Sequence, residues 1–228
     1  MKKLFLLATL MVGVSLWCGA QESAQQPDPA GDWTPFQVVF LPHFPSASWT
    51  SNVYGIKSGW PITDGIGCVN GLEASWLWSG TDVINGIQGS WVLCMNRTFN
   101  GLQAAFVTCI NRDKGQGLQA TLVYSQAGEF NGIQGGLVCL SDRFRGLQAA
   151  LALNVNTDDV TGFQAAGVNV VNGKFTGVQC GLYSQVEECS GVQLGLVNVS
   201  GGGGLQFGLL NYIEDAWIPI FPILNFSF

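Results

Sequence analysis

A tandem repeat of about 15 residues constrains the fold of this chain more than any other feature. Glycine, an apolar residue and glutamine recur together, and successive motif glycines from Gly71 onward are separated by 15, 15, 16, 15, 14, 16, 15, 14 and 13 residues. A degenerate copy, Gly71-Leu72-Glu73, starts the series. The glutamines of the nine full copies are Gln88, Gln103, Gln119, Gln134, Gln148, Gln164, Gln179, Gln193 and Gln206.

The residues between the glutamines indicate β-strands. Val, Leu, Phe and Trp alternate with small residues, and no 3.6-residue apolar period extends over a helical length. Helical repeat units also exceed about 30 residues, twice the length found here. Nearly all charges of the array fall in polar turns between the copies. We therefore assign the chain to the all-β class.

The preferred fold is a β-solenoid of about ten coils of about 15 residues, with N- and C-terminal caps. Equivalent residues of stacked coils lie about 4.8 Å apart, so glutamines in constant phase can pair their amides as an internal ladder. In Gly191–Val199 the apolar positions shift phase between Leu196 and Val197, which predicts a bend between two short strands.

The alternative is an up-and-down outer-membrane β-barrel of about 12 strands. Leu224, Phe226 and Phe228 alternate up to a C-terminal aromatic residue, which resembles the targeting signal of such barrels. However, antiparallel neighbours bring the start of one strand to the end of the next, and a motif of constant phase then gains no ladder. The solenoid is preferred for this reason.

The chain divides into five segments. Residues 1–20 have a basic start, an apolar run and small residues at Gly19 and Ala20, which is typical of a cleaved secretory signal peptide. Residues 21–35 predict a flexible leader, and 36–70 an N-terminal β cap. Residues 71–212 are the tandem β-repeat array, and 213–228 predict a capping segment.

The closing copies GVQLGLVNVS and GLQFGLLNYI, followed by PIFPILNFSF, resemble a bacterial family of exported surface-repeat proteins with tandem G-x-Q-x-G-L-x-N units. The resemblance covers Gly71 to Phe228 and is most specific in the last two copies and the tail. It implies export and placement at the surface or in the envelope. It implies no activity, substrate or catalytic residue.

We find no constellation of residues that points to catalysis. His43 is the only histidine, and no nucleophile motif surrounds any Ser or Cys. The carboxylate pairs Asp158-Asp159, Glu187-Glu188 and Glu214-Asp215 lie in predicted turns, where solvated side chains are the expected outcome. We therefore expect no enzyme, no catalytic or cofactor-binding residues, no cofactor and no metal site.

Two groups of residues suggest packing contacts. Cys94 and Cys109 share a repeat position, and Cys180 and Cys189 flank one turn, so each pair is a candidate disulfide, with buried thiols as the alternative. In a solenoid, we expect the tryptophans of the N-terminal third to pack in the core and the cap, with a carbohydrate-stacking platform as the alternative. They are Trp33, Trp49, Trp60, Trp76, Trp78 and Trp91.

These features predict a non-enzymatic, exported structural or surface protein that presents a rigid β surface in the bacterial cell envelope. The alternatives are an outer-membrane pore or anchor and, more weakly, a protein that binds or cleaves envelope polysaccharide. The net charge of −6 argues against a nucleic-acid partner, because no basic stripe can displace counterions from phosphates. We expect an envelope or surface partner, and a location at the cell surface, outer membrane or periplasm. Association with the outer membrane is left open.

Overall fold

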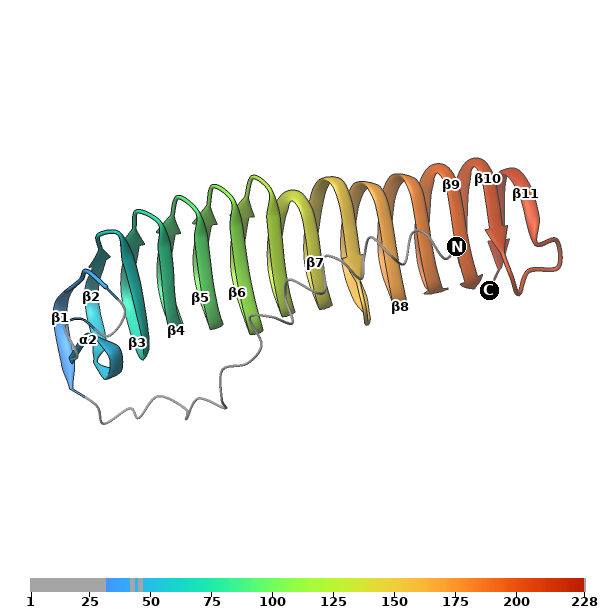
Figure 1. The fold of residues 1–228 in the computed structure, drawn as a ribbon. Coiled ribbons are helices and arrows are strands. Elements are labelled where there is room, and N and C mark those ends of the chain that lie inside the picture. Colours follow the sequence, from blue (N-terminus) through green and yellow to red (C-terminus); the bar gives the residue numbers. More distant parts are fainter. Residues whose placement is uncertain (1–31, 42–43, 45–46, 228) are drawn as a thin grey trace.

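The computed structural model describes residues 32–41, 44 and 47–227, and there the chain winds into a β-solenoid of about 12 turns (Figure 1). The predicted fold class is confirmed. The elements are β1 (Trp33–Val39), α2 (Ala47–Thr50), β2 (Asn52–Gly59), β3 (Ile62–Ser75), β4 (Trp78–Ser90), β5 (Leu93–Ala105), β6 (Thr108–Thr121), β7 (Tyr124–Asn156), β8 (Val160–Cys189), β9 (Val192–Gly202), β10 (Gly204–Ile213) and β11 (Ile220–Ser227). The predicted signal peptide, most of the leader, His43 and Phe228 lie outside the described residues.

The strands form one sheet in chain order, and the pairs from β1 to β10 are parallel (Figure 1). An up-and-down barrel needs antiparallel neighbours, so the barrel alternative is wrong. Parallel stacking sets each repeat directly on the equivalent residues of the previous one. For example, Gly86, Ile87 and Gln88 pair with Gly101, Leu102 and Gln103.

The stacked array begins before the predicted boundary at residue 71. Gly55 and Lys57 of β2 pair with Gly71 and Glu73 of β3, and Gln37 of β1 pairs in turn with Lys57. The expected cap therefore continues the array as further coils, and Trp33–Pro35 of the expected leader belongs to β1. At the position of the motif glutamine, these coils have the buried polar residues Gln37, Lys57 and Glu73. Each of these side chains can form hydrogen bonds, although only Gln37 is a glutamine.

The array ends at a change of strand direction. β11 pairs antiparallel with β10, and its Asn225 lies opposite Gln206. The backbone N–H of Ile213 donates to the carbonyl of Pro219, which closes the connection between the two strands. Because a reversed strand does not repeat the register of the parallel coils, β11 covers the last parallel strand and stops the series.

Close backbone approach explains the motif glycine. The motif glycines from Gly71 to Gly177 have φ between 116° and 148°, a region that L side chains rarely adopt. A Cβ added to Gly132 would lie 2.0 Å from the carbonyl oxygen of Gly117, and the other motif glycines from Gly86 to Gly177 stand equally close to their predecessors. A side chain at this position would push adjacent coils apart.

We predict that Gly132→Ala destabilises the protein by at least about 2 kcal/mol, because the methyl group meets backbone that cannot move without breaking the coil pairing. Gly135→Ala is the matched control in the same coil. Its Cβ would lie 3.8 Å from the nearest atom, the carbonyl oxygen of Ala149, and should change stability by less than about 0.5 kcal/mol. Urea unfolding measures both variants, and equal midpoints would contradict the close approach.

Candidate functional site

The interior of the solenoid contains a continuous column of amides. All nine motif glutamines are buried, and most donate from Nε2 to the Oε1 of the glutamine one coil earlier. Seven such bonds, with lengths between 2.8 and 3.1 Å, join Gln88 to Gln103 and link the run from Gln119 to Gln206. A buried amide must find partners, and here the next coil provides them.

The ladder is interrupted once. Gln119 donates to the backbone carbonyls of Cys109 and Gln126, and the Oε1 of Gln103 accepts from Asn111 Nδ2 at 2.9 Å. At the C-terminal end, Oε1 of Gln206 has no hydrogen-bond partner among the described residues. Each donated bond points back along the chain, so the last acceptor of the column has no following glutamine to satisfy it.

At the N-terminal end the amide column becomes a charged network. Lys57 and Glu73 are fully buried at the glutamine position. Lys57 Nζ donates to Thr81 Oγ1 at 2.8 Å and to the carbonyl of Asp64 at 2.9 Å, and Thr81 Oγ1 donates to Glu73 Oε1 at 2.9 Å. Gln88 Nε2 donates to Glu73 Oε2 at 3.3 Å and so joins this network to the ladder.

The surroundings of Lys57 have two opposite effects on its pKa. Burial lowers the pKa of Lys57, while the negative charges of Glu73 and Asp64 raise it. This pair was not predicted from the sequence, although Gly55-Ile56-Lys57 and Gly71-Leu72-Glu73 stand in phase with the motif. The opposite charges of Lys57 and Glu73 in adjacent copies indicate a buried ion pair, because stacking brings equivalent residues together in the interior.

The six cysteines within the described residues are free thiols, so neither candidate disulfide is formed. Cys94 and Cys109 are register partners, but Cys94 Sγ lies 3.3 Å from Ser90 Oγ and 3.4 Å from the Ala104 carbonyl. Burial, together with the neighbouring Cys94 thiol, raises the pKa of Cys109. Disulfide formation proceeds through the thiolate, so a raised pKa slows the formation of this disulfide.

The two cysteines of the second candidate pair lie toward opposite edges of one coil. Cys180 directly follows the buried Gln179 and precedes Leu182, which is exposed at one edge of the solenoid. Cys189 instead lines a surface hollow at the opposite edge, together with Glu187 and Glu188. The sequence analysis treated the two cysteines as the flanks of one turn, whereas β8 continues through both.

Because the glutamines point inward, their apolar chain neighbours point outward. The residue before each glutamine is apolar and is half-exposed in several copies, as at Ile87, Leu102 and Ile133. Further outward residues gather at one edge, which we call the apolar edge. It consists of Trp60, Trp76, Trp91, Phe106, Leu122, Leu137, Leu151, Leu182, Leu196 and Leu209, all exposed. The expectation that Trp60, Trp76 and Trp91 pack inside is therefore wrong.

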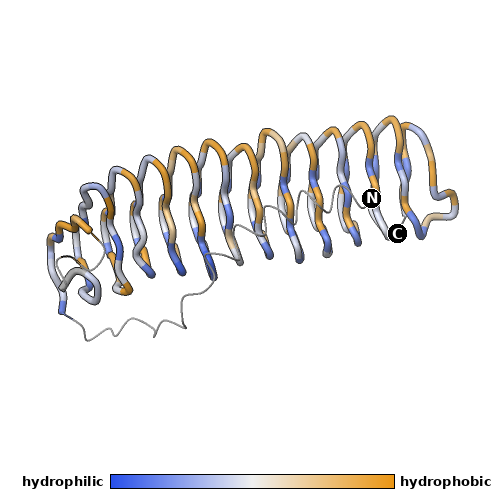
Figure 2. The backbone as a smooth tube through the Cα atoms, viewed as in Figure 1, coloured by the Kyte–Doolittle hydropathy of each residue, from blue (hydrophilic) through white to orange (hydrophobic). Residues whose placement is uncertain are grey.

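The opposite edge carries the charges. Figure 2 shows hydrophobic residues along one long edge of the solenoid and hydrophilic residues along the other. We call the latter the charged edge. It consists of the charged residues that lie between the repeat copies, namely Asp82, Arg97, Arg112, Asp113, Lys114, Glu129, Asp142, Arg143, Asp158, Asp159, Lys174, Glu187, Glu188, Glu214 and Asp215.

Ion pairs connect adjacent coils over the N-terminal and central part of the charged edge. Arg143 lies 2.8 Å from Glu129 and 3.9 Å from Asp158, and Arg97 lies 3.5 Å from Asp82. The C-terminal end is acidic, and there four carboxylates line the surface hollow. Within the described ranges, no three His, Cys, Asp or Glu side chains are grouped so that they could hold a metal ion. All three carboxylate pairs are solvent-exposed.

Comparisons of the chain with protein-family models, with curated proteins and with solved structures found no match. Among the residues described, none of the helical segments has the length and apolar character needed to span a membrane. The candidate functional features are therefore the two edges and the polar interior that supports them.

The amide ladder makes a direct prediction about stability. Gln148 donates to Gln134 and accepts from Gln164, each at 2.9 Å. Gln148→Leu leaves the Gln134 acceptor without its donor and removes one partner of Gln164, so we expect a loss of about 1–3 kcal/mol. Leu147→Gln is the control, because Leu147 is 40% exposed and should change stability by less than about 0.5 kcal/mol. Urea unfolding tests both, and a neutral Gln148→Leu variant would count against the ladder.

The charged network makes a second prediction. Glu73→Gln removes the main negative charge near the buried Lys57, and we expect a loss of about 3 kcal/mol. The double variant Lys57→Gln, Glu73→Gln extends the amide column and should recover most of this loss. Because the folded-state pKa of Lys57 lies below its unfolded value of 10.5, the buried ammonium is most costly at low pH. The difference in unfolding free energy between Glu73→Gln and the double variant should therefore shrink as pH rises toward 10.5. A difference that stays constant from pH 7 to 10.5 would contradict a buried, charged Lys57.

Proposed function

We propose that this protein is a non-catalytic structural component of the bacterial cell envelope that presents a rigid β surface. The observation that carries the proposal is the continuous parallel pairing from β1 to β10, which makes the described chain one rod with two chemically different edges. A rod of this kind serves to hold surfaces at a fixed separation and orientation.

Stiffness follows from how the coils are joined. Each coil contacts its neighbours through backbone pairing, and the buried glutamines add a side-chain bond at most steps. Bending the rod would lengthen the Nε2–Oε1 distances on one side of the interior. Ion pairs such as Arg143–Glu129 span the same steps on the surface. The array therefore resists bending by several independent sets of contacts.

Placement in the envelope is supported by sequence. Residues 1–20 have the charge and hydropathy pattern of a secretory signal, and the last repeats resemble exported surface-repeat proteins. The pore alternative depended on a barrel and no longer has a basis, since the parallel coils enclose a filled interior of buried side chains. The binding partner that this function requires is expected at one of the two edges.

Export is tested by expressing the full chain in a bacterium with an envelope of two membranes. We expect cleavage after Ala20, so that the mature protein begins at Gln21 and fractionates with the envelope. A control with Leu7→Arg and Leu10→Arg interrupts the apolar run and should stay unprocessed in the cytoplasm. Intact-mass spectrometry of each fraction measures the outcome. Uncleaved native chain in the cytoplasm would overturn the proposed location.

A further inference from the structure

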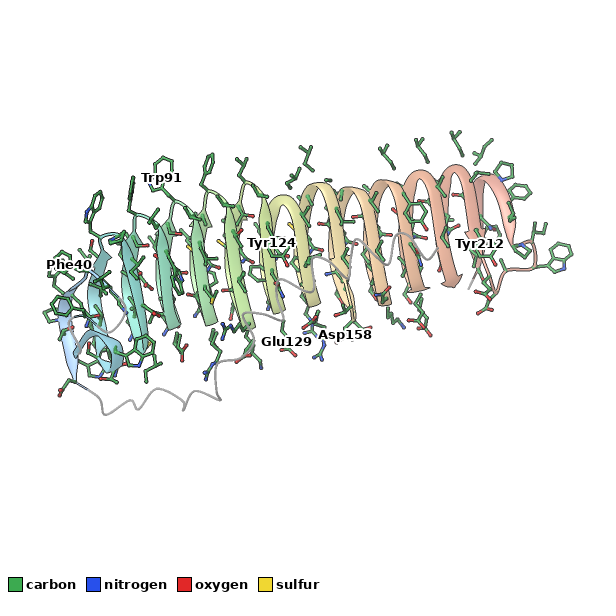
Figure 3. All side chains as sticks on the ribbon, in the orientation of Figure 1. Phe40, Trp91, Tyr124, Glu129, Asp158 and Tyr212 are labelled. Atoms are coloured by element: carbon green, nitrogen blue, oxygen red, sulfur yellow. The ribbon has the colours of Figure 1, made fainter. Side chains whose placement is uncertain are left out.

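The apolar edge lacks a partner among the described residues and extends along the rod. Its side chains protrude from the bend of successive coils, as Figure 3 shows for Trp91. Trp91 is 61% exposed and Leu151 is 80% exposed, values far above those of the buried interior. Soluble proteins rarely expose a continuous apolar patch of this extent without a binding role.

Charge is excluded from this edge. The chain neighbours of all ten apolar-edge residues are uncharged, for example Ser90 and Val92 around Trp91. Glu129 and Asp158 lie at the opposite edge in Figure 3. The rod is therefore amphipathic across its width, with an apolar side and a charged side. This arrangement suits a boundary between an apolar phase and water.

Backbone N–H groups at the apolar edge are hydrogen-bonded to carbonyls of the preceding coil, as an apolar medium requires. The N–H of Trp91 donates to the carbonyl of Trp76 at 3.2 Å, and the N–H of Leu122 donates to that of Phe106 at 3.3 Å. Leu137 continues the series by donating to Leu122 at 3.2 Å. These bonds run along the rod, so peptide groups in the bend are paired without water. Lipid tolerates backbone only in this condition.

The character of the edge distinguishes between occupants. A second copy would need one fixed register, but from Leu122 onward the edge repeats leucine in most coils, and a shift by one coil changes little there. A polysaccharide would stack on aromatic rings, whereas the edge is aliphatic from Leu122 onward. A fluid apolar phase requires neither a fixed register nor aromatic rings.

We propose that the apolar edge docks the protein on the surface of a lipid bilayer, with the rod lying along the membrane and the charged edge in water. Trp60, Trp76 and Trp91 then lie at the interface, where tryptophan is favoured. The net charge of −6 and the acidic C-terminal end of the charged edge provide no attraction to anionic lipid. Binding should therefore depend on apolar insertion and occur on zwitterionic phosphatidylcholine.

This inference rests on the proposed function for its biological setting, but the vesicle experiment does not require export. The test is flotation of the purified full chain with phosphatidylcholine vesicles. All proteins carry Leu7→Arg and Leu10→Arg, so that the apolar run of residues 4–17 does not itself bind lipid. Failure of export with intact vesicle binding would overturn only the envelope location, and the reverse would overturn only the docking.

The decisive comparison uses two triple variants that each remove three exposed apolar residues from the same three coils. The edge variant carries Trp91→Ser, Phe106→Ser and Leu122→Ser. The face variant carries Ile87→Ser, Leu102→Ser and Leu118→Ser, which lie one column before the buried glutamines. We expect vesicle binding to fall at least about tenfold in the edge variant and less than about twofold in the face variant. Matching urea midpoints confirm that both fold.

Four results would overturn the proposal. The parent protein fails to float with vesicles, or both triple variants float as well as the parent. Alternatively, sedimentation without lipid shows that the parent is a dimer, the edge variant is a monomer, and neither floats, which would identify a second copy as the occupant. Binding that falls as salt is raised from 50 to about 500 mM would also contradict apolar insertion, because such attraction would be electrostatic.

Discussion

The requirement that every buried amide has a partner is the constraint on which this structure depends. A glutamine inside one coil can be satisfied by the glutamine of the next coil only if the two coils are parallel and in register. A slip by one residue would replace the Gln148–Gln164 bond with contacts between an amide and an outward-facing aliphatic position. The polar interior therefore specifies one arrangement, which an aliphatic interior of similar size would specify less strictly.

The motif glycine and the amide ladder act together. The positive φ and the missing side chain allow adjacent backbones to approach, and the approach brings the glutamines within 2.8–3.1 Å of one another. Nearer the charged edge, buried apolar side chains also stabilise the interior. Phe99 belongs to one cluster of these side chains, and Phe130, Phe144 and Phe175 belong to another. The interior thus combines a column of amides with apolar clusters. Successive side chains of a strand point to opposite faces. The apolar residues next to the inward-pointing glutamines therefore point outward.

This division explains why the proposed function concerns surfaces. In most solenoids one expects apolar residues inside and polar residues outside, and the rod then interacts through particular side chains. Here alternation along each strand exposes Leu102 beside the buried Gln103, and the bends expose Trp91 and Leu151. Most charges lie at the other edge, and an inward-pointing charge needs a buried counter-charge, as Lys57 has in Glu73.

The sequence by itself determined the repeat length, the β class and the stacking of the motif glutamines, because a motif of constant phase is informative only when equivalent residues meet. It left the coils before Gly71 unrecognised, since Lys57 stands where the motif has glutamine and Pro35 stands where the motif has glycine. It also misjudged Trp60, Trp76 and Trp91, because strand alternation does not say which side is the interior. Only the tertiary structure decided that question. The amides can be satisfied inside by their own copies, whereas Trp60, Trp76 and Trp91 lie at a bend from which their side chains point outward.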